Sequence, residues 1–176
     1  MGVLIPSLQS GLLNQSSAQV IDGSLKFNET SGSYLTRTPS SSGNRRTWTW
    51  SCWCKIAKLP ESGTNGDRTL FSAVDTSNGG DDDSIRFIRS GITGGQSLYW
   101  SSSEYNVGDE EAIYTNAVLR DPNAFYHVVL IKDTTQSSLA NGQMRMYING
   151  VEQSLVESNA ISQNAERAIN SQVPHA

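Results

Sequence analysis

The clearest pattern of apolar and polar positions lies between residues 124 and 152, where two strand-like runs flank a polar loop. One face of the first run has four residues that we expect to be buried, Phe125, His127, Val129 and Ile131. One face of the second run has three more, Met144, Met146 and Ile148. This period of two is typical of a pleated strand with one side in the core. The Asn149-Gly150 pair that follows predicts a tight hairpin turn, because both central positions need positive φ.

Similar short strands are predicted along most of the chain. The densest spans residues 47–55, with Trp48, Trp50, Cys52 and Cys54 on one face and Thr49, Ser51, Trp53 and Lys55 on the other. The remaining predicted strands are residues 24–27, 34–37, 69–75, 84–90, 97–101, 112–119 and 151–156. Ile85, Phe87, Leu98 and Trp100 are expected to point inward. Only residues 160–169 have slight helical character. The pattern predicts an all-β fold, an antiparallel β-sandwich over residues 20–176, preceded by an N-terminal arm over residues 1–19.

Composition narrows the classes of function. A chain of 176 residues with 36% hydrophobic content can form one sizeable core. The formal net charge is -4 and there is no basic stripe, so we do not expect nucleic-acid binding. The first residues lack Lys and Arg and no apolar run is long enough to span a bilayer, so we expect neither a secretory signal nor membrane insertion.

The two cysteines, Cys52 and Cys54, stand two positions apart on one face of a predicted strand. A disulfide between such close neighbours on an extended strand would be strained. We therefore expect reduced thiols in or near the core. A metal site is the alternative, but only two histidines and no further cysteine could complete it.

Four segments in order, SLKFNETSGSYLTRTP, RRTWTWSCWCKI, NAFYHVVLIKD and MRMYINGVE, resemble a concanavalin A-like jelly roll of the laminin G type. The versions they resemble are common in structural proteins of marine bacteriophages. The resemblance covers about residues 20–156. It implies two antiparallel sheets packed face to face and a concave face that often binds glycans in relatives. It also implies roles in virion decoration, tail fibres or host-surface adhesion.

In such folds a final long strand follows the hairpin region and lies beside the first strand. The sequence stops at residue 176, about where that segment would begin. The closing strand is then absent, or the chain is shortened, or a partner supplies the strand. The last alternative is physically sensible because an unpaired sheet edge invites strand addition.

Two acidic clusters are candidate sites. Asp81, Asp82 and Asp83 lie in a predicted Gly-rich loop, where the alternatives are a solvated loop and a calcium site. Asp109, Glu110 and Glu111 form the second cluster, but the chain has no Glu-x-Asp-x-Glu spacing of the kind that sandwich glycosidases use. No Gly-x-Ser-x-Gly elbow occurs either, and we expect His127 to be a core or packing residue. The protein is therefore predicted not to be an enzyme and to have no cofactor unless calcium binds.

Candidate interaction surfaces come from aromatic and apolar residues. Trp53 falls on the polar face of its strand, and four tyrosines could extend such a face, Tyr99, Tyr105, Tyr114 and Tyr147. The arm has six apolar residues that would fold back on the sandwich or dock the domain on a neighbour, Val3, Leu4, Ile5, Leu8, Leu12 and Leu13.

The resemblance, taken with the missing catalytic carboxylates and the apolar arm, implies a non-enzymatic virion structural protein, either a capsid decoration or a tail or fibre component, assembled in the host cytoplasm. Its expected partners are other virion proteins, with adhesion to a host-surface glycan and homo-oligomer formation as further expectations. The alternative is a lectin-like carbohydrate-binding module, with or without calcium.

Overall fold

The computed structural model describes residues 23, 25–27, 32–57, 67–75, 82–89, 96–103 and 111–176. The chain divides into two units, residues 1–34 and residues 35–176. The described residues of the first unit form no strand, so the strand predicted at residues 24–27 is wrong for residues 25–27. The arm predicted at residues 1–19 lies outside the described residues, and its boundary with the sandwich stays a prediction.

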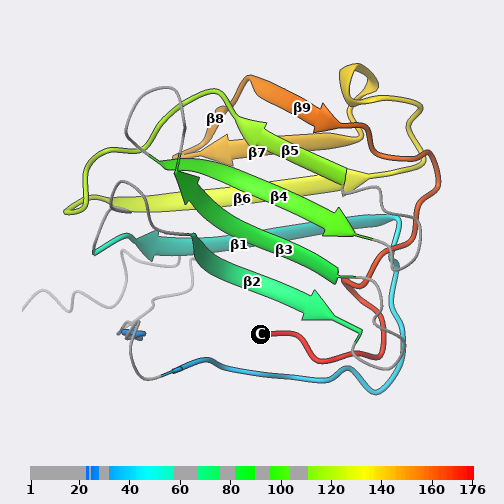
Figure 1. Cartoon of the computed structure of the whole chain (residues 1–176), viewed down its shortest axis with the longest axis horizontal. Coiled ribbons are helices and arrows are strands. Elements are labelled where there is room, and N and C mark those ends of the chain that lie inside the picture. Colours follow the sequence, from blue (N-terminus) through cyan, green and yellow to red (C-terminus); the bar gives the residue numbers. More distant parts are fainter. Residues whose placement is uncertain are drawn as a thin grey trace, which may run out of the picture. The chain divides into compact units, whose positions relative to one another are not determined.

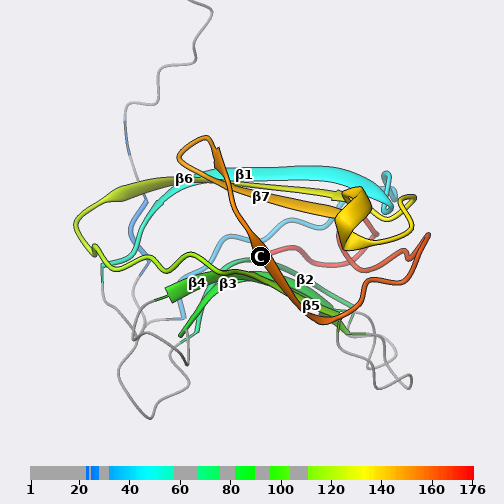
Figure 2. The same ribbon diagram turned by 90° about the horizontal axis from the view of Figure 1, so that it is seen from above.

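The second unit is an antiparallel β-sandwich (Figures 1 and 2). One sheet has four strands in the order β1 (Thr47–Lys55), β6 (Phe125–Asp133), β7 (Met144–Ile148) and β8 (Val151–Glu152). The other has five in the order β2 (Arg68–Val74), β3 (Asp82–Arg89), β4 (Gln96–Ser103), β5 (Glu111–Thr115) and β9 (Leu155–Asn159). The predicted all-β, two-sheet architecture is confirmed. The described residues contain no helix that is long and apolar enough to cross a membrane.

The core lies between the two sheets and is built from alternate residues of their strands. The five-stranded sheet supplies Ile85, Phe87, Leu98, Trp100 and Ile113, and the four-stranded sheet supplies Trp48, Val128, Leu130, Met144 and Met146. All of these side chains are buried. The inward faces predicted for residues 84–90, 97–101 and 144–148 are therefore confirmed, because a strand with one polar face leaves only one way to bury its apolar face.

The orientation of strand β6 is the reverse of the predicted one. Its buried residues are Tyr126, Val128, Leu130 and Lys132, whereas the predicted inward set, Phe125, His127, Val129 and Ile131, points to the outside of the sandwich. Both faces of this strand are apolar, and the charge of Lys132 suggests from sequence alone that the true inner face is the outer one. Strand pairing fixes the orientation, because Lys132 lies opposite Trp48 on β1 and Met144 on β7, both of which point inward.

The predicted hairpin turn is confirmed at Asn149 and Gly150, whose φ angles are 52° and 78°. The turn joins Ile148 to its pairing partner Val151. The strand predicted at residues 151–156 is only partly right, because β8 ends after two residues and the chain then crosses to the other sheet as β9. No helix forms in residues 160–169, and the sequence pattern does not predict the short 3-10 helix at Leu139–Asn141.

The last residues of the chain lie along the outer edge of β2 (Figure 1). The Ser72 amide donates to the Ala176 carbonyl at 2.6 Å, and the Ala176 amide donates back at 2.8 Å. On the other side of this segment, Arg37 and His175 exchange two backbone hydrogen bonds of 2.9 Å. The edge of β2 is therefore paired within the chain, and the expectation of a closing strand that is absent or supplied by a partner stays a prediction. The strand predicted at residues 34–37 is reduced to the bridge at Arg37.

Candidate binding surfaces

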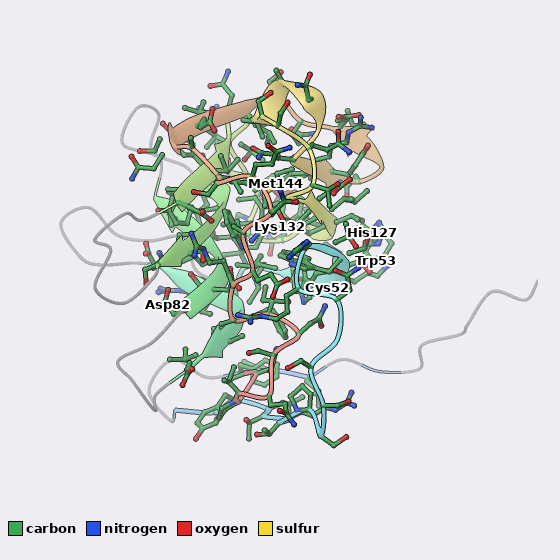
Figure 3. All side chains as sticks on the ribbon, turned by 90° about the vertical axis from the view of Figure 1, so that its right-hand side faces the viewer. Cys52, Trp53, Asp82, His127, Lys132 and Met144 are labelled. Atoms are coloured by element: carbon green, nitrogen blue, oxygen red, sulfur yellow. The ribbon has the colours of Figure 1, made fainter. Side chains whose placement is uncertain are left out.

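The outward side of the four-stranded sheet, which we call the outer face, is unusually rich in aromatic and apolar side chains. It comprises Thr49, Ser51, Trp53, Lys55, Phe125, His127, Val129, Ile131, Arg145 and Tyr147. Trp53 is 64% exposed and Phe125 is 56% exposed. Figure 3 shows Trp53 and His127 together on this side, while Lys132 and Met144 lie between the sheets. Exposed aromatic side chains on a flat sheet are a common feature of interaction sites.

Trp53 and His127 form the centre of the outer face. The strand register places them opposite each other on β1 and β6, and their rings stack with centroids 4.9 Å apart. The backbone amide of His127 donates to the Asn149 side-chain oxygen at 2.9 Å, which ties β6 to the hairpin turn. The predicted burial of His127 in the core is therefore wrong, whereas its predicted packing role is confirmed by the contact with Trp53. His127 supports an exposed indole ring on a rigid strand.

Tyr147 lies at the polar side of the outer face. Its hydroxyl donates to the Glu152 carboxylate at 3.1 Å, and the same carboxylate lies 4.0 Å from the Arg145 guanidinium. At the other end, the Lys55 ammonium lies 5.8 Å from the centroid of the Phe125 ring. An aromatic centre with a polar margin is the usual composition of a protein-binding patch.

Tyr99 belongs to a different surface. It lies on β4, in the five-stranded sheet, and points away from the core, because its neighbours Leu98 and Trp100 point inward. Its ring stacks on Tyr114 with centroids 6.4 Å apart, and the Arg86 guanidinium lies 4.9 Å from its centroid. Arg86 also donates to the Ser101 hydroxyl at 2.7 Å. The structure thus brings Trp53 and Tyr147 onto one face and places Tyr99 on the opposite face of the sandwich.

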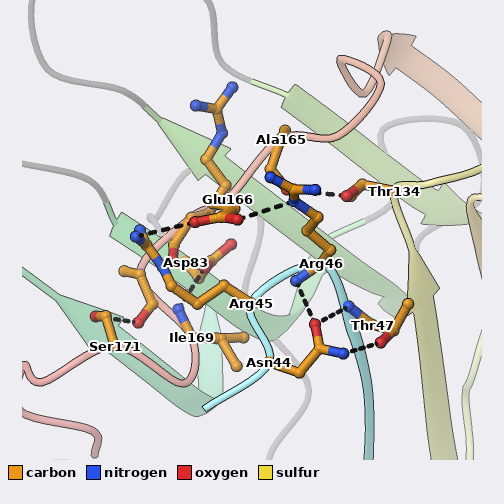
Figure 4. Close-up of polar contacts among 12 residues, drawn as sticks. Asn44, Arg45, Arg46, Thr47, Asp83, Thr134, Ala165, Glu166, Ile169 and Ser171 are labelled. Carbon is orange, nitrogen blue, oxygen red and sulfur yellow. Dashed lines mark hydrogen bonds and ion pairs between the residues drawn. The ribbon is translucent and has the colours of Figure 1, made fainter. Parts of the chain in front are cut away.

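The predicted calcium ligands are separated by the strand that contains them. Asp81 lies outside the described residues, and Asp82 and Asp83 are successive residues of β3, so their carboxylates point to opposite sides of the sheet. Asp82 accepts a hydrogen bond from Ser103, and Asp83 is buried in the core, where it accepts one from the Ile169 amide at 2.7 Å (Figure 4). The loop predicted for these two residues is wrong. Across the described part of the chain, no three His, Cys, Asp or Glu residues form a metal-binding group, and calcium binding stays a prediction.

Of the second acidic cluster, the structure describes only Glu111. Glu111 begins β5 and is buried, and its carboxylate accepts hydrogen bonds from Arg167 at 2.7 Å and from the Ser162 amide at 3.1 Å. Asp109 and Glu110 lie outside the described residues. Glu111 therefore holds the segment that follows β9 against the five-stranded sheet.

The cysteines are free thiols on the inward side of β1, both half-buried. Cys54 donates a weak hydrogen bond to the Tyr126 carbonyl at 3.7 Å. The thiol of Cys54 and burial together raise the pKa of Cys52, whereas hydrogen bonding from Cys52 lowers the pKa of Cys54.

Sequence reasoning misses Phe125 and Arg86 as surface residues, whereas Tyr114 is one of the tyrosines considered for such a face. Phe125 could be found from the pairing of β6 with β7, because the inward position of Met144 fixes Lys132 as inward and Phe125 as outward. No local signal places Tyr114 and Arg86 beside Tyr99, since the three residues meet only through the pairing of three strands. Tyr105 and the arm residues from Val3 to Leu13 lie outside the described residues.

Two antiparallel sheets packed face to face, with the exposed Trp53 and Phe125 on the outward side of the four-stranded sheet, form a sandwich that fits a binding module. A family model of the concanavalin A-like lectin/glucanases superfamily matches residues 28–170, and the chain belongs to this superfamily. No curated protein and no solved structure matches the chain. The family match confirms the resemblance to a concanavalin A-like, laminin G-type domain.

Proposed function

We propose that the domain is a non-enzymatic binding module that docks on another protein through the outer face of its four-stranded sheet. The observation that carries this proposal is the exposure of Trp53 and Phe125, beside a stacked His127, on a sheet whose other side packs against the core. Solvating such an aromatic surface is unfavourable, and tryptophan is the residue most enriched among binding hot spots.

The partner that we propose is another structural protein of a phage particle, in a capsid decoration or a tail fibre. Support for the virion comes from the resemblance of four ordered segments to marine phage structural proteins. The net charge of -4 fits a protein partner better than a nucleic acid. The proposed location is the assembled particle, with the apolar arm at residues 3–13 as a second attachment point.

The test compares particles assembled with the wild-type protein and with the Trp53→Ala/Phe125→Ala double variant. Loss of a hot spot of about 2 kcal/mol weakens binding roughly thirtyfold, so occupancy on purified particles should fall to near background. Val74→Ala, which changes an exposed residue on β2 of the other sheet, is the matched control and should keep normal occupancy. Normal occupancy of a folded double variant would refute the proposed surface, and absence of the wild-type protein from particles would refute the virion assignment.

A specific observation favours carbohydrate binding as the second candidate. The Tyr99–Tyr114 pair, with the Arg86 guanidinium over one ring, offers aromatic and polar groups of the kind that hold a sugar. Tyr99→Ala should then abolish binding to host polysaccharide while Trp53→Ala leaves it intact. A calcium-dependent version of this site predicts a higher melting temperature in calcium than in EDTA.

A further inference from the structure

In the part of the chain that the structure describes, the two sheets have four edges, and three of them are covered, short or irregular. Residues 174–176 pair with the edge of β2. Strand β8 has only two residues, and β9 is short and pairs irregularly with β5. Features of this kind prevent a sheet edge from pairing with other chains. Strand β1 differs: it ends the four-stranded sheet (Figure 1), it has nine residues, and its register with β6 is regular throughout.

The pairing with β6 shows which backbone groups of β1 lie on its open side. The Thr134 amide donates to the Arg46 carbonyl at 2.9 Å. Bonded and non-bonded positions alternate along an antiparallel pair, so the even-numbered residues of β1 bond to β6 and the N–H and C=O groups of the odd-numbered residues point away. The Thr47 amide on this side donates to the Asn44 side-chain oxygen at 3.0 Å. Within the described residues, three further odd positions have backbone groups without a hydrogen-bond partner: Thr49, Ser51 and Trp53.

The inward side chains of β1 are also less covered than those of the strand beside it. Trp50, Cys52 and Cys54 are only half-buried, whereas Val128 and Leu130 on β6 are fully buried. The difference arises because β6 has a strand on both sides and β1 has a strand on one. A further strand beside β1 would therefore remove more apolar surface from water, which favours association.

We propose that β1 of a second copy of this chain pairs antiparallel with β1, so that two four-stranded sheets become one continuous sheet. The register that pairs all nine residues centres on Ser51, which then lies opposite Ser51 of the second copy. Thr49 lies opposite Trp53 of the second copy, and Trp50 lies opposite its Cys52. The three central pairs of odd-numbered residues exchange about six backbone hydrogen bonds.

A second copy fits this edge because the edge is complementary to itself. Donors and acceptors that alternate along one strand match the same strand after a twofold rotation, and a twofold interface closes at the dimer. The register places Lys55 opposite Thr47 of the second copy, so no like charges face each other. The half-buried Trp50 and Cys52 of the two copies cover one another on the inward side.

The dimer goes beyond the proposed function and does not depend on it, since backbone groups and inward side chains form the contact. It does have a consequence for the outer face. The outer faces of the two copies would become one continuous surface with two exposed Trp53 rings, so a partner with repeated binding sites could engage both at once.

The first test is the mass of the purified full chain in solution, measured by sedimentation over a wide range of concentration. We expect twice the mass of one chain at high concentration and the mass of one chain after dilution. The mass of a single chain at every concentration would overturn the proposal.

Proline at position 51 tests the edge specifically. Ser51→Pro removes an N–H that points away from β6 and leaves the bonds to β6 in place, an orientation in which edge strands accept proline. The dissociation constant of the dimer should rise about thirtyfold, because each copy loses one hydrogen bond. Ser51→Ala keeps the N–H and should dimerise as the wild type does. An unchanged dissociation constant in a folded Ser51→Pro variant would overturn the proposal.

Hydrogen exchange of the wild-type amides decides the question even if the proline variant fails to fold. The amides of Thr49, Ser51 and Trp53 should exchange more slowly as the protein concentration rises. The amides of Trp50 and Cys52 bond to β6 and should be slow already in the monomer. Fast exchange at the three odd positions in a sample that sediments as a dimer would place the interface elsewhere. These measurements use no phage particles, so their failure is distinct from failure of the proposed function.

Discussion

The interior of the sandwich and the outer face of the four-stranded sheet contain the same kinds of group in different surroundings. Both have apolar residues of β6, a lysine near an aromatic ring and an arginine–glutamate pair. Inside, Arg167 and Glu111 are in contact at 2.7 Å and buried, whereas outside Arg145 and Glu152 are 4.0 Å apart and about half exposed. The comparison teaches that the surroundings of a group, more than its chemical type, decide whether it stabilises the fold or remains available to a partner.

Removing the arginine of each ion pair should give the largest difference in stability between an interior and a surface variant. Arg167→Ala leaves the Glu111 carboxylate buried and uncompensated, so we expect a loss of about 3–5 kcal/mol in the free energy of unfolding. Arg145→Ala leaves the Glu152 carboxylate in contact with water, so we expect a loss of less than about 1 kcal/mol in the free energy of unfolding. Urea denaturation of the two variants would measure the difference, and equal losses would contradict the contrast between interior and surface.

Truncating neighbouring residues of β6 should give the next largest contrast. Leu130 is fully buried, so Leu130→Ala should cost about 2–5 kcal/mol through lost packing and a cavity. Val129, its neighbour in the chain, points to the outer face, and Val129→Ala should cost about 1 kcal/mol or less. Thermal or chemical unfolding of the pair tests the corrected orientation of β6 directly: a larger loss for Val129→Ala would restore the orientation that the sequence alone predicts.

The smallest effect concerns Asp133, at the end of β6. Hydrogen bonds from the Thr135 hydroxyl at 2.6 Å and the Gln136 amide at 3.0 Å lower the pKa of this carboxyl below its ordinary value. A lowered pKa means that the stabilisation is present above the pKa of the unfolded state, and that it is lost as the pH falls through the pKa of the folded state. Because the Asp133 carboxyl is near solvent, we expect its ionised form to contribute less than about 1 kcal/mol to the free energy of unfolding.

The measurement for Asp133 is the pH dependence of unfolding in Asp133→Asn and the wild type. The variant should be less stable at neutral pH, and the gap should close in acid, where the wild-type carboxyl also becomes neutral. A gap of constant size from neutral pH to strong acid would show that the hydrogen bonds of the ionised form do not contribute.

The sequence predicts those elements whose two faces differ in polarity. Thr49, Ser51 and Lys55 mark the outer side of β1, and Arg145 marks that of β7, so the placement of Trp53 and the orientation of β7 follow from local pattern. Strand β6 has no such marker, because Val129 and Ile131 are as apolar as Val128 and Leu130. Its orientation depends on pairing with β1 and β7, which is information from distant parts of the chain.

For the same reason, the sequence assigns some of the candidate surface residues correctly and leaves others unassigned. Trp53 can be assigned to an outward surface from its own strand. Tyr99 and Tyr147 cannot be assigned to a common surface, because membership of a sheet is a long-range property that alternation along one strand does not report. Asp83 shows the same limit in the other direction: three successive acids look like a solvated loop, and only the pairing of β3 with β4 reveals that one of them is in the core.

The pairing of residues 174–176 between Arg37 and β2 affects how the domain would respond to a pulling force. Residue 175 runs antiparallel to residue 37 on one side and to residue 73 on the other. A force that pulls residue 35 and residue 176 apart therefore acts on neighbouring antiparallel segments from the same end, and it peels the two hydrogen bonds of the Arg37–His175 bridge apart rather than loading them in shear. A domain tethered from one side only would leave this bridge without load, whereas one stretched between two anchors would begin to open there.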